Sequence, residues 1–303
     1  MRILLTGVRG SIGSVLLPAL LRDGHDVVGF ARDPSRVRAG VPVVAGDAVS
    51  GAGLDEALDG VEVAYFLIHS MEGAEAGFDE RERRSAENFV AAAGRAGVRR
   101  VVYLGGLVPT DRGPSRHLGS RLEVENVLLA GLPEAVALRA SIVIGSRSRS
   151  FRFLVRLVER LPVLALPGWR VHRTRPIDAR DVTAYLLASA HTPHVRGGLS
   201  LDIAGPDVMT YGEMIGRIAD LMLLRRPAIG LSMNATAIAA PVAAAIAGED
   251  PGLIAPLMES LSSDLLPRDD RAADLLGVRL HSFDGAVERA LRDWEAGEEL
   301  AAR

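Results

Sequence analysis

Short apolar runs alternate with longer amphipathic stretches along the first half of this 303-residue chain. The apolar runs are rich in β-branched residues, which is typical of buried strands. They predict strands over residues 2–6, 26–30, 41–45, 61–68, 100–105 and 134–139. The stretches between them carry apolar residues at helical spacing and predict helices near residues 12–23, 53–59, 79–97 and 118–131.

This alternation predicts an α/β fold, a doubly wound parallel Rossmann sheet with helices on both faces. Most of the predicted strands are apolar on both faces, as a sheet covered on both sides requires. We expect this NADP-binding domain to span residues 1–145, with returning elements around residues 170–205.

The pattern changes after residue 145, and we expect residues 146–303 to form a smaller, mostly helical substrate-binding or lid region. An amphipathic helix is predicted over residues 150–162, and its apolar side either packs into the core or covers an aromatic substrate. Thr210 and Glu213 form a capping-box pattern that predicts another helix start. The run 235–248 is too short for a membrane span and predicts a buried or lid helix.

Composition excludes several classes of function. A formal net charge of -3 gives no general attraction to nucleic acids or acidic membranes. The absence of cysteine excludes disulfides, Cys-ligated metal and thiol catalysis, and it fits a cytoplasmic protein. All 35 basic residues are arginine, so no lysine is present to form a Schiff base. We expect no metal site and no signal peptide, and the oligomeric state is not predicted.

A glycine-rich turn lies between the first predicted strand and helix, in the sequence LLTGVRGSIG. Gly7, Gly10 and Gly13 allow the backbone to turn tightly and approach a pyrophosphate closely. The amides of Ser11 and Ile12 would then face the phosphates at the helix N-terminus. The order strand, turn, helix, second strand predicts a dinucleotide-binding site.

The end of the second predicted strand selects the cofactor. An acidic residue there usually binds the ribose of NAD, whereas arginine accepts the 2′-phosphate of NADP. Here the acidic position is taken by apolar residues, and Arg32 and Arg36 follow, with Arg9 inside the glycine loop. Guanidinium groups suit a phosphate, so we expect NADPH. The alternative is that these arginines are solvated and partly neutralised by Asp33.

Three further strand ends supply candidate cofactor contacts. Asp47 and Ala48 follow the third strand and would meet the adenine, although Asp47 is equally suited to cap its loop. Leu67, His69 and Ser70 end the fourth strand and would line the path to the nicotinamide. Gly105 ends the fifth strand, where backbone amides would face a developing alkoxide.

Taken together, these segments resemble the atypical members of the extended short-chain dehydrogenase/reductase superfamily. The matching motifs are TGVRGSIG, ARDPSR, AGD, GVEVAYFLIHS, RRVVYLGGL, LRASIVIG and RPIDARDV, and they cover residues 1–205 in order. Standard members use a Ser and a Tyr-x-x-x-Lys pair. On this sequence the serine position falls on Gly105 or Gly106, the tyrosine on His117 and the lysine on Arg121. The resemblance therefore implies the fold and cofactor site without the usual acid–base residues.

Several interpretations remain open. His117 could donate the proton while Arg121 holds the nicotinamide ribose. Positioning alone, with a phenol of the substrate as proton source, could also suffice. In this interpretation the chain is similar to antibiotic-tailoring ketoreductases of the angucyclinone type. The resemblance implies an NADPH-dependent oxidoreductase whose small-molecule partner is a polycyclic aromatic ketone of polyketide type. The alternatives are a non-catalytic NADPH sensor like the NmrA-like proteins, or another NAD(P)-dependent activity such as isomerisation.

Overall fold

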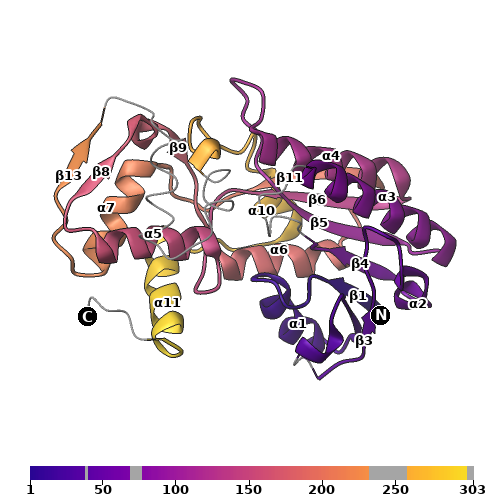
Figure 1. Cartoon of the computed structure of the whole chain (residues 1–303). Coiled ribbons are helices and arrows are strands. Elements are labelled where there is room, and N and C mark those ends of the chain that lie inside the picture. The colour runs from indigo at the N-terminus through magenta and orange to yellow at the C-terminus, as the bar shows by residue number, and fades with distance from the viewer. Residues whose placement is uncertain (38–39, 69–76, 232–257, 299–303) are drawn as a thin grey trace.

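Seven parallel strands form the central sheet of the computed structural model, which describes residues 1–37, 40–68, 77–231 and 258–298 (Figure 1). Their order is β11–β6–β5–β4–β1–β2–β3, so the direction of strand succession reverses between β1 and β4. The strands are β1 (Arg2–Thr6), β2 (Asp26–Ala31), β3 (Val43–Ala45), β4 (Val63–Phe66), β5 (Arg100–Gly106), β6 (Glu134–Ala140) and β11 (Gly197–Ile203). The predicted doubly wound sheet is confirmed.

Helices cover both faces of the sheet, as Figure 1 shows. The helices of this part are α1 (Gly13–Arg22), α2 (Leu54–Leu58), α3 (Phe78–Ala96), α4 (Arg116–Gly131) and α6 (Ala179–His191). Side chains of α1 and α6 share one buried cluster with β1, β4, β5 and β6, including Leu16, Leu20 and Leu186. Side chains of α2, α3 and α4 form a second cluster on the other face, including Leu54 and Phe89. Burial of these apolar surfaces is the main favourable contribution to folding.

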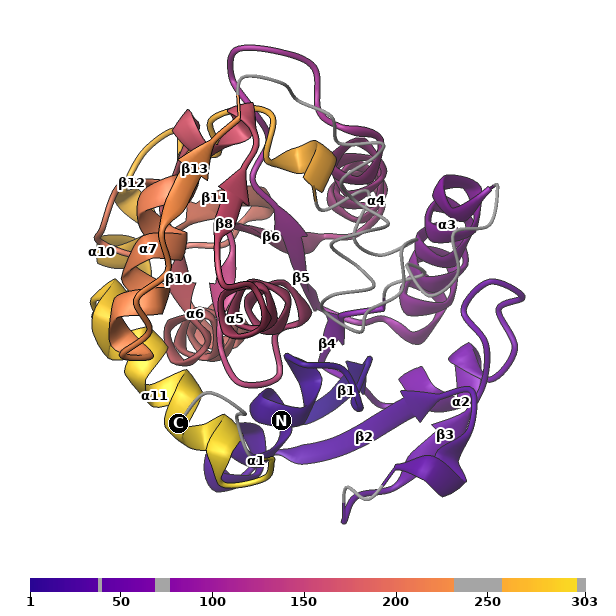
Figure 2. The same cartoon turned by 60° about the vertical axis from the view of Figure 1, so that its left-hand side comes forward.

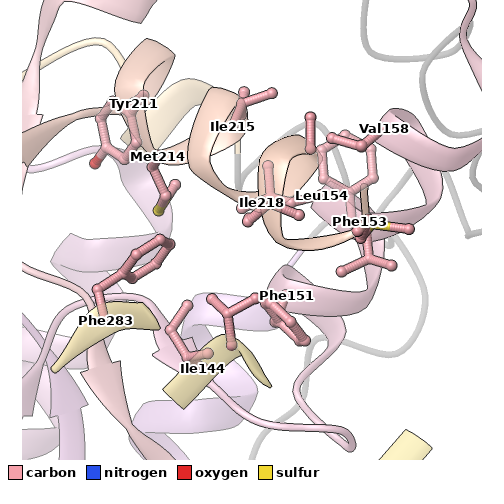
Figure 3. Packing of buried hydrophobic residues seen from close by; sticks show 14 of the residues in the cluster. Ile144, Phe151, Phe153, Leu154, Val158, Tyr211, Met214, Ile215, Ile218 and Phe283 are labelled. Carbon is pink, nitrogen blue, oxygen red and sulfur yellow. The ribbon is translucent and has the colours of Figure 1, made fainter. Parts of the chain in front are cut away.

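A third buried cluster holds together the second half of the chain, whose elements lie beside one another in Figure 2. Its main elements are α5 (Arg149–Arg160), α7 (Tyr211–Leu221), α11 (Phe283–Glu295) and the strand pair β8 (Leu164–Leu166) with β13 (Ala228–Gly230). In Figure 3, Leu154 and Val158 of α5 lie close to Ile218 of α7. Both tryptophans of the chain, Trp169 and Trp294, belong to this cluster.

Short elements complete the described part and connect the two halves. They are the 3-10 turns η1 (Pro34–Arg36) and η2 (Gly168–Val171), the strands β7 (Val143–Ile144), β9 (Arg173–Thr174), β10 (Ile177–Asp178) and β12 (Met209–Thr210), and helix α10 (Arg271–Leu276). β7 pairs with β10, and β9 pairs with β12. The chain thus leaves the central sheet after β6, returns to it for α6 and β11, and leaves it again.

Polar side chains set the starts of several helices. Ser115, Ser148 and Asp178 accept hydrogen bonds from backbone amides in the first turns of α4, α5 and α6. The predicted capping box is present, because Thr210 and Glu213 each bind the backbone amide of the other at the start of α7. Such caps satisfy amides that have no partner inside the helix.

The sequence predicted these main strands and helices to within a few residues. It missed the short strand pairs of the second half, including β8 with β13. The predicted helix at residues 235–248 lies outside the described residues. Within those residues, none of the helices combines the length and hydropathy that a membrane span needs.

A buried ion pair fixes α4 against the sheet. Arg139 on β6 donates to both carboxylate oxygens of Glu125 on α4, with Nε to Oε2 at 2.9 Å and Nη2 to Oε1 at 2.6 Å. The side-chain oxygen of Ser200 on β11 donates to the same carboxylate, and Asp202 lies 3.6 Å from Arg139 Nη1. Glu125 and Arg139 are buried, so α4 is held in one register relative to β6 and β11.

The first prediction concerns this pair. Glu125→Ala should lower the free energy of unfolding by about 3–5 kcal/mol, because it leaves a buried guanidinium beside the empty carboxylate position. The matched control is Glu87→Ala, which removes an exposed partner of Arg83 and should cost about 0–1 kcal/mol. Urea unfolding of both variants measures the difference. Equal effects would contradict the role assigned to the pair.

Candidate functional site

The predicted glycine turn has the geometry of a phosphate-binding loop. Gly7 follows β1 with φ +64°, a conformation that favours glycine, and a Cβ there would lie 2.5 Å from the carbonyl oxygen of Leu67. A Cβ on Gly13 would lie 2.3 Å from the carbonyl oxygen of Gly7. The two glycines therefore let α1 start directly against the end of β1 and beside β4.

A single large cavity opens at the carboxyl ends of the sheet strands, where doubly wound folds bind their ligands. Its volume is about 1170 Å³, beyond the roughly 300–1,000 Å³ of pockets for one drug-sized ligand. Most of the predicted site residues line it, namely Gly7, Arg9, Gly10, Ser11, Ile12, Arg32, Arg36, Asp47, Ala48, Leu67, Gly105, His117 and Arg121. Gly13 lies buried behind the loop, and its role is the close approach described above. His69 and Ser70 lie outside the described residues.

Arginines gather at the end of the cavity formed by the loops after β1 and β2. Among the described residues, no carboxylate lies within ion-pair distance of Arg9, Arg32 or Arg36. Asp33 is engaged instead at the start of η1, where one carboxylate oxygen accepts from the amide of Ser35 at 3.1 Å and from its hydroxyl at 2.5 Å. The Ser35 hydroxyl is the main reason that the pKa of Asp33 is lowered, with smaller contributions from Arg36 and Arg9.

Asp47 caps its own loop, one of the two roles that its position allowed. Its Oδ1 accepts from the amide of Val49 at 2.9 Å, while the residue also lines the cavity with Ala48. This hydrogen bond holds the loop after β3 in a fixed turn beside the arginines.

Helix α4 brings His117 and Arg121, the two positions that the resemblance compares with the usual Tyr and Lys, to the cavity. His117, in the first turn, is buried and lines the wall. Arg121 lies one turn further along, and its Nη1 donates to the carbonyl oxygen of Leu104 at 3.3 Å. Its Nε is buried and has no hydrogen-bond partner among the described residues. A Cβ on Gly106, one of the two positions compared with the usual serine, would lie 2.7 Å from Cδ2 of Leu118, at the movable end of that side chain.

One tyrosine reaches the cavity, although sequence spacing did not indicate it. Tyr211, at the start of α7, lines the wall because β12 pairs with β9 and brings residue 211 there. Tyr65 and Tyr103 donate instead to the carbonyl oxygens of Leu186 and Arg121. Burial raises the pKa of Tyr211 well above its ordinary value, so its hydroxyl stays protonated at neutral pH.

The other end of the cavity combines apolar and basic side chains. Its apolar wall comes from α5 and from the segment after residue 257, and consists of Phe153, Leu154, Met258, Leu261 and Leu265. Figure 3 shows Phe153 and Leu154 on the same part of α5 as Val158. Arg81 of α3 and the loop arginines Arg147 and Arg149 also line the cavity. Sequence analysis missed these arginines, because nothing in their local pattern indicates the cavity.

No group of three or more histidine or carboxylate side chains in the described ranges is placed to hold a metal ion.

Comparison with known proteins agrees with a dinucleotide-binding site at the glycine turn. Residues 7–141 match a family model described as NAD(P)H-binding. The chain is 26% identical over 146 residues to the NADH dehydrogenase [ubiquinone] 1 alpha subcomplex subunit 9 of Arabidopsis thaliana, covering 48% of this chain and 36% of that protein. It is 30% identical over 223 residues to a 3 beta-hydroxysteroid dehydrogenase/Delta 5-->4-isomerase of Mycobacterium tuberculosis. This match covers 63% of this chain and 60% of that protein. The chain thus spans less than two thirds of both relatives.

A nucleoside-diphosphate-sugar epimerase from Staphylococcus aureus has a similar solved structure. The TM-score is 0.77 at 17% identity, over 95% of this chain and all of the other. At this identity the likeness shows the fold alone. Together, the family model and the solved structure indicate an NAD(P)-binding chain with a Rossmann fold.

The second prediction tests the loop geometry. Gly13→Ala should weaken NADPH binding at least tenfold, because the new methyl group meets the backbone of Gly7 and pushes α1 away from the loop. Gly94→Ala in α3 is the matched control, since nothing lies within 4 Å of its Cβ position, and it should leave NADPH affinity unchanged. Titration of NADPH fluorescence measures both. Unchanged affinity in Gly13→Ala would refute the assignment of the loop.

Proposed function

We propose that this protein binds NADPH and uses it to reduce the carbonyl group of a small compound with an apolar ring system. The observation that carries the proposal is the continuity of the cavity. One space joins a phosphate-binding loop, three arginines without acidic partners in the described residues, and an apolar chamber. A cofactor at the first end and a substrate at the other would meet between them.

The choice of NADPH over NADH rests on charge. Arg9, Arg32 and Arg36 line the same end of the cavity, and a 2′-phosphate offers oxygens for bidentate pairing. Hydrogen bonds from Ser35 already hold the carboxylate of Asp33, so it forms no ion pair with the arginines within 4 Å. The residues present therefore suit a phosphorylated adenosine ribose.

Bound NADPH would supply the hydride. The carbonyl carbon of the substrate accepts it, the electron pair of the C=O bond moves to oxygen, and a proton completes the alcohol. Arg121 lies beside the end of β5 and would hold the nicotinamide ribose or the substrate. Fixed positioning by the cavity wall supplies the rest of the rate enhancement.

The proton has two candidate sources. His117 lines the cavity at the position that tyrosine takes in standard family members, and imidazole is a competent acid near neutral pH. A phenol beside the carbonyl of an aromatic polyketide-type substrate would serve as well. The presence of His117 and Arg121 in place of the usual Tyr and Lys favours the substrate phenol as the proton source, since arginine does not relay protons at neutral pH.

The substrate class follows from the apolar wall. Phe153, Leu154, Leu261 and Leu265 suit the face of a fused-ring compound better than a sugar. The M. tuberculosis relative is named for a hydroxysteroid, which is also a polycyclic ring compound. We therefore favour a polycyclic ketone, aromatic polyketides included.

A non-catalytic NADPH sensor of the NmrA-like type is the second candidate. The observation that favours it is the replacement of the usual acid–base pair by His117 and Arg121. The two functions differ in turnover. Oxidation of NADPH by a panel of polycyclic ketones and quinones is expected for the reductase, whereas tight NADPH binding with no oxidation across the panel would favour the sensor.

The third prediction concerns cofactor selection. Arg32→Gln should weaken NADPH binding about 10- to 100-fold, the scale of a lost charge-assisted hydrogen bond to phosphate, and leave NADH binding nearly unchanged. Fluorescence titration with each nucleotide measures the ratio. Arg225→Gln, an exposed arginine outside the cavity wall, is the control and should change neither affinity. Equal losses for the two nucleotides would remove the basis for NADPH.

The fourth prediction separates the proton sources. His117→Gln should keep NADPH affinity and retain at least about a tenth of kcat on a ketone that carries an adjacent phenol, because removing a true general acid costs about 10²–10⁴-fold. The same ketone without the phenol is the control substrate and should react far more slowly with both proteins. Complete loss of turnover with intact NADPH binding would assign the proton to His117.

A further inference from the structure

The wall of the cavity is strongly basic. Among the described residues it contains one carboxylate, Asp47, and the arginines Arg9, Arg32, Arg36, Arg81, Arg121, Arg147 and Arg149. One carboxylate oxygen of Asp47 accepts a hydrogen bond from the amide of Val49 within its own loop. The cavity therefore concentrates positive charge, although the whole chain has a net charge of -3.

Outside the cavity, most of the described arginines form ion pairs with carboxylates. Arg95 pairs with Asp55, and Arg217 pairs with Asp284. Arg121 and Arg147 have no carboxylate within 4 Å among the described residues. Guanidinium groups that line a cavity without an acidic partner attract anions, since low-dielectric walls focus their field.

The arginines lie at two ends of the cavity. Arg9, Arg32 and Arg36 follow β1 and β2, and the proposed function assigns them to the 2′-phosphate. Arg147 belongs to the loop after β7 that leads into α5, next to the apolar chamber. Arg121 belongs to α4, and it reaches the end of β5 with a buried Nε that has no partner in the described part. The proposed function assigns the pyrophosphate to the glycine loop and the 2′-phosphate to the arginines after β1 and β2, so Arg147 and Arg121 have no assigned phosphate.

We propose that the substrate is an anion, a ring compound with a carboxylate that Arg121 and Arg147 bind while Phe153, Leu154 and Leu265 cover its ring. This inference rests on the proposed function, because it names the substrate class of the same site. A planar carboxylate matches the fork of a guanidinium, and partial burial strengthens the pairing relative to water. The apolar residues exclude water from the ring and keep the carboxylate at one edge.

The experiment compares two probes that differ in charge. Anthraquinone-2-carboxylate and anthraquinone-2-carboxamide have nearly the same shape, and their binding to NADP-loaded protein is measured by calorimetry, so turnover is not needed. We expect the carboxylate to bind about 10- to 100-fold more tightly, as charge-assisted hydrogen bonds predict. Its affinity should also fall with added salt while that of the amide does not.

Two variants locate the effect. Arg147→Gln, at an exposed position whose substitution leaves the fold intact, should reduce the preference for the carboxylate at least threefold. Arg121→Gln should reduce it further, because that side chain is partly buried. Arg225→Gln, exposed and outside the cavity wall, should leave the preference unchanged.

Several outcomes would overturn the inference. They are equal affinities for the two probes, no binding of the carboxylate, tighter binding of UDP-glucose than of the carboxylate, or a preference that survives both cavity substitutions. Failure of the proposed function gives a different result. Either no NADP binds in the loading step, or NADPH binds and no ketone or quinone of the panel is reduced, and neither result depends on the charge of the probe.

Discussion

The contact between the first helix and the turn after the first strand is the constraint on which the site depends. Only residues without a Cβ allow α1 to start against the carbonyl of Gly7. This places the amides of the helix N-terminus at the edge of the sheet and beside the reversal of strand order between β1 and β4. The cavity, its arginines and its apolar chamber are all arranged around that edge.

A second constraint acts on the opposite side of the cavity. Helix α4 carries His117 and Arg121, and the ion pair between Glu125 and Arg139 holds that helix against β6. Tyr103 on β5 also contacts this helix, because its hydroxyl donates to the carbonyl oxygen of Arg121. The helix that carries His117 and Arg121 is thus fixed against the sheet at the wall of the cavity. The fixed position of α4 and the charge of Arg121 are what this helix contributes to the cavity.

Local pattern predicted the sheet and the glycine turn well, because both are encoded within short stretches. The apolar runs specify β1 to β6, and the glycine spacing specifies the loop. The substrate end depends on contacts between distant residues. Tyr211 reaches the wall through the pairing of β12 with β9, and Leu265 packs against Leu107 and Leu118 from far along the chain. Neither contact leaves a periodic signal, so sequence reasoning could not place them.

The two tryptophans also have a practical consequence. Trp169 and Trp294 are both buried in the cluster of the second half, and the guanidinium group of Arg152 lies 4.1 Å from the ring centre of Trp294. No tryptophan lies in the Rossmann half of the chain. Intrinsic indole emission therefore reports on the second half of the chain alone, and energy transfer from it to a bound reduced nicotinamide would report the distance between that half and the cofactor.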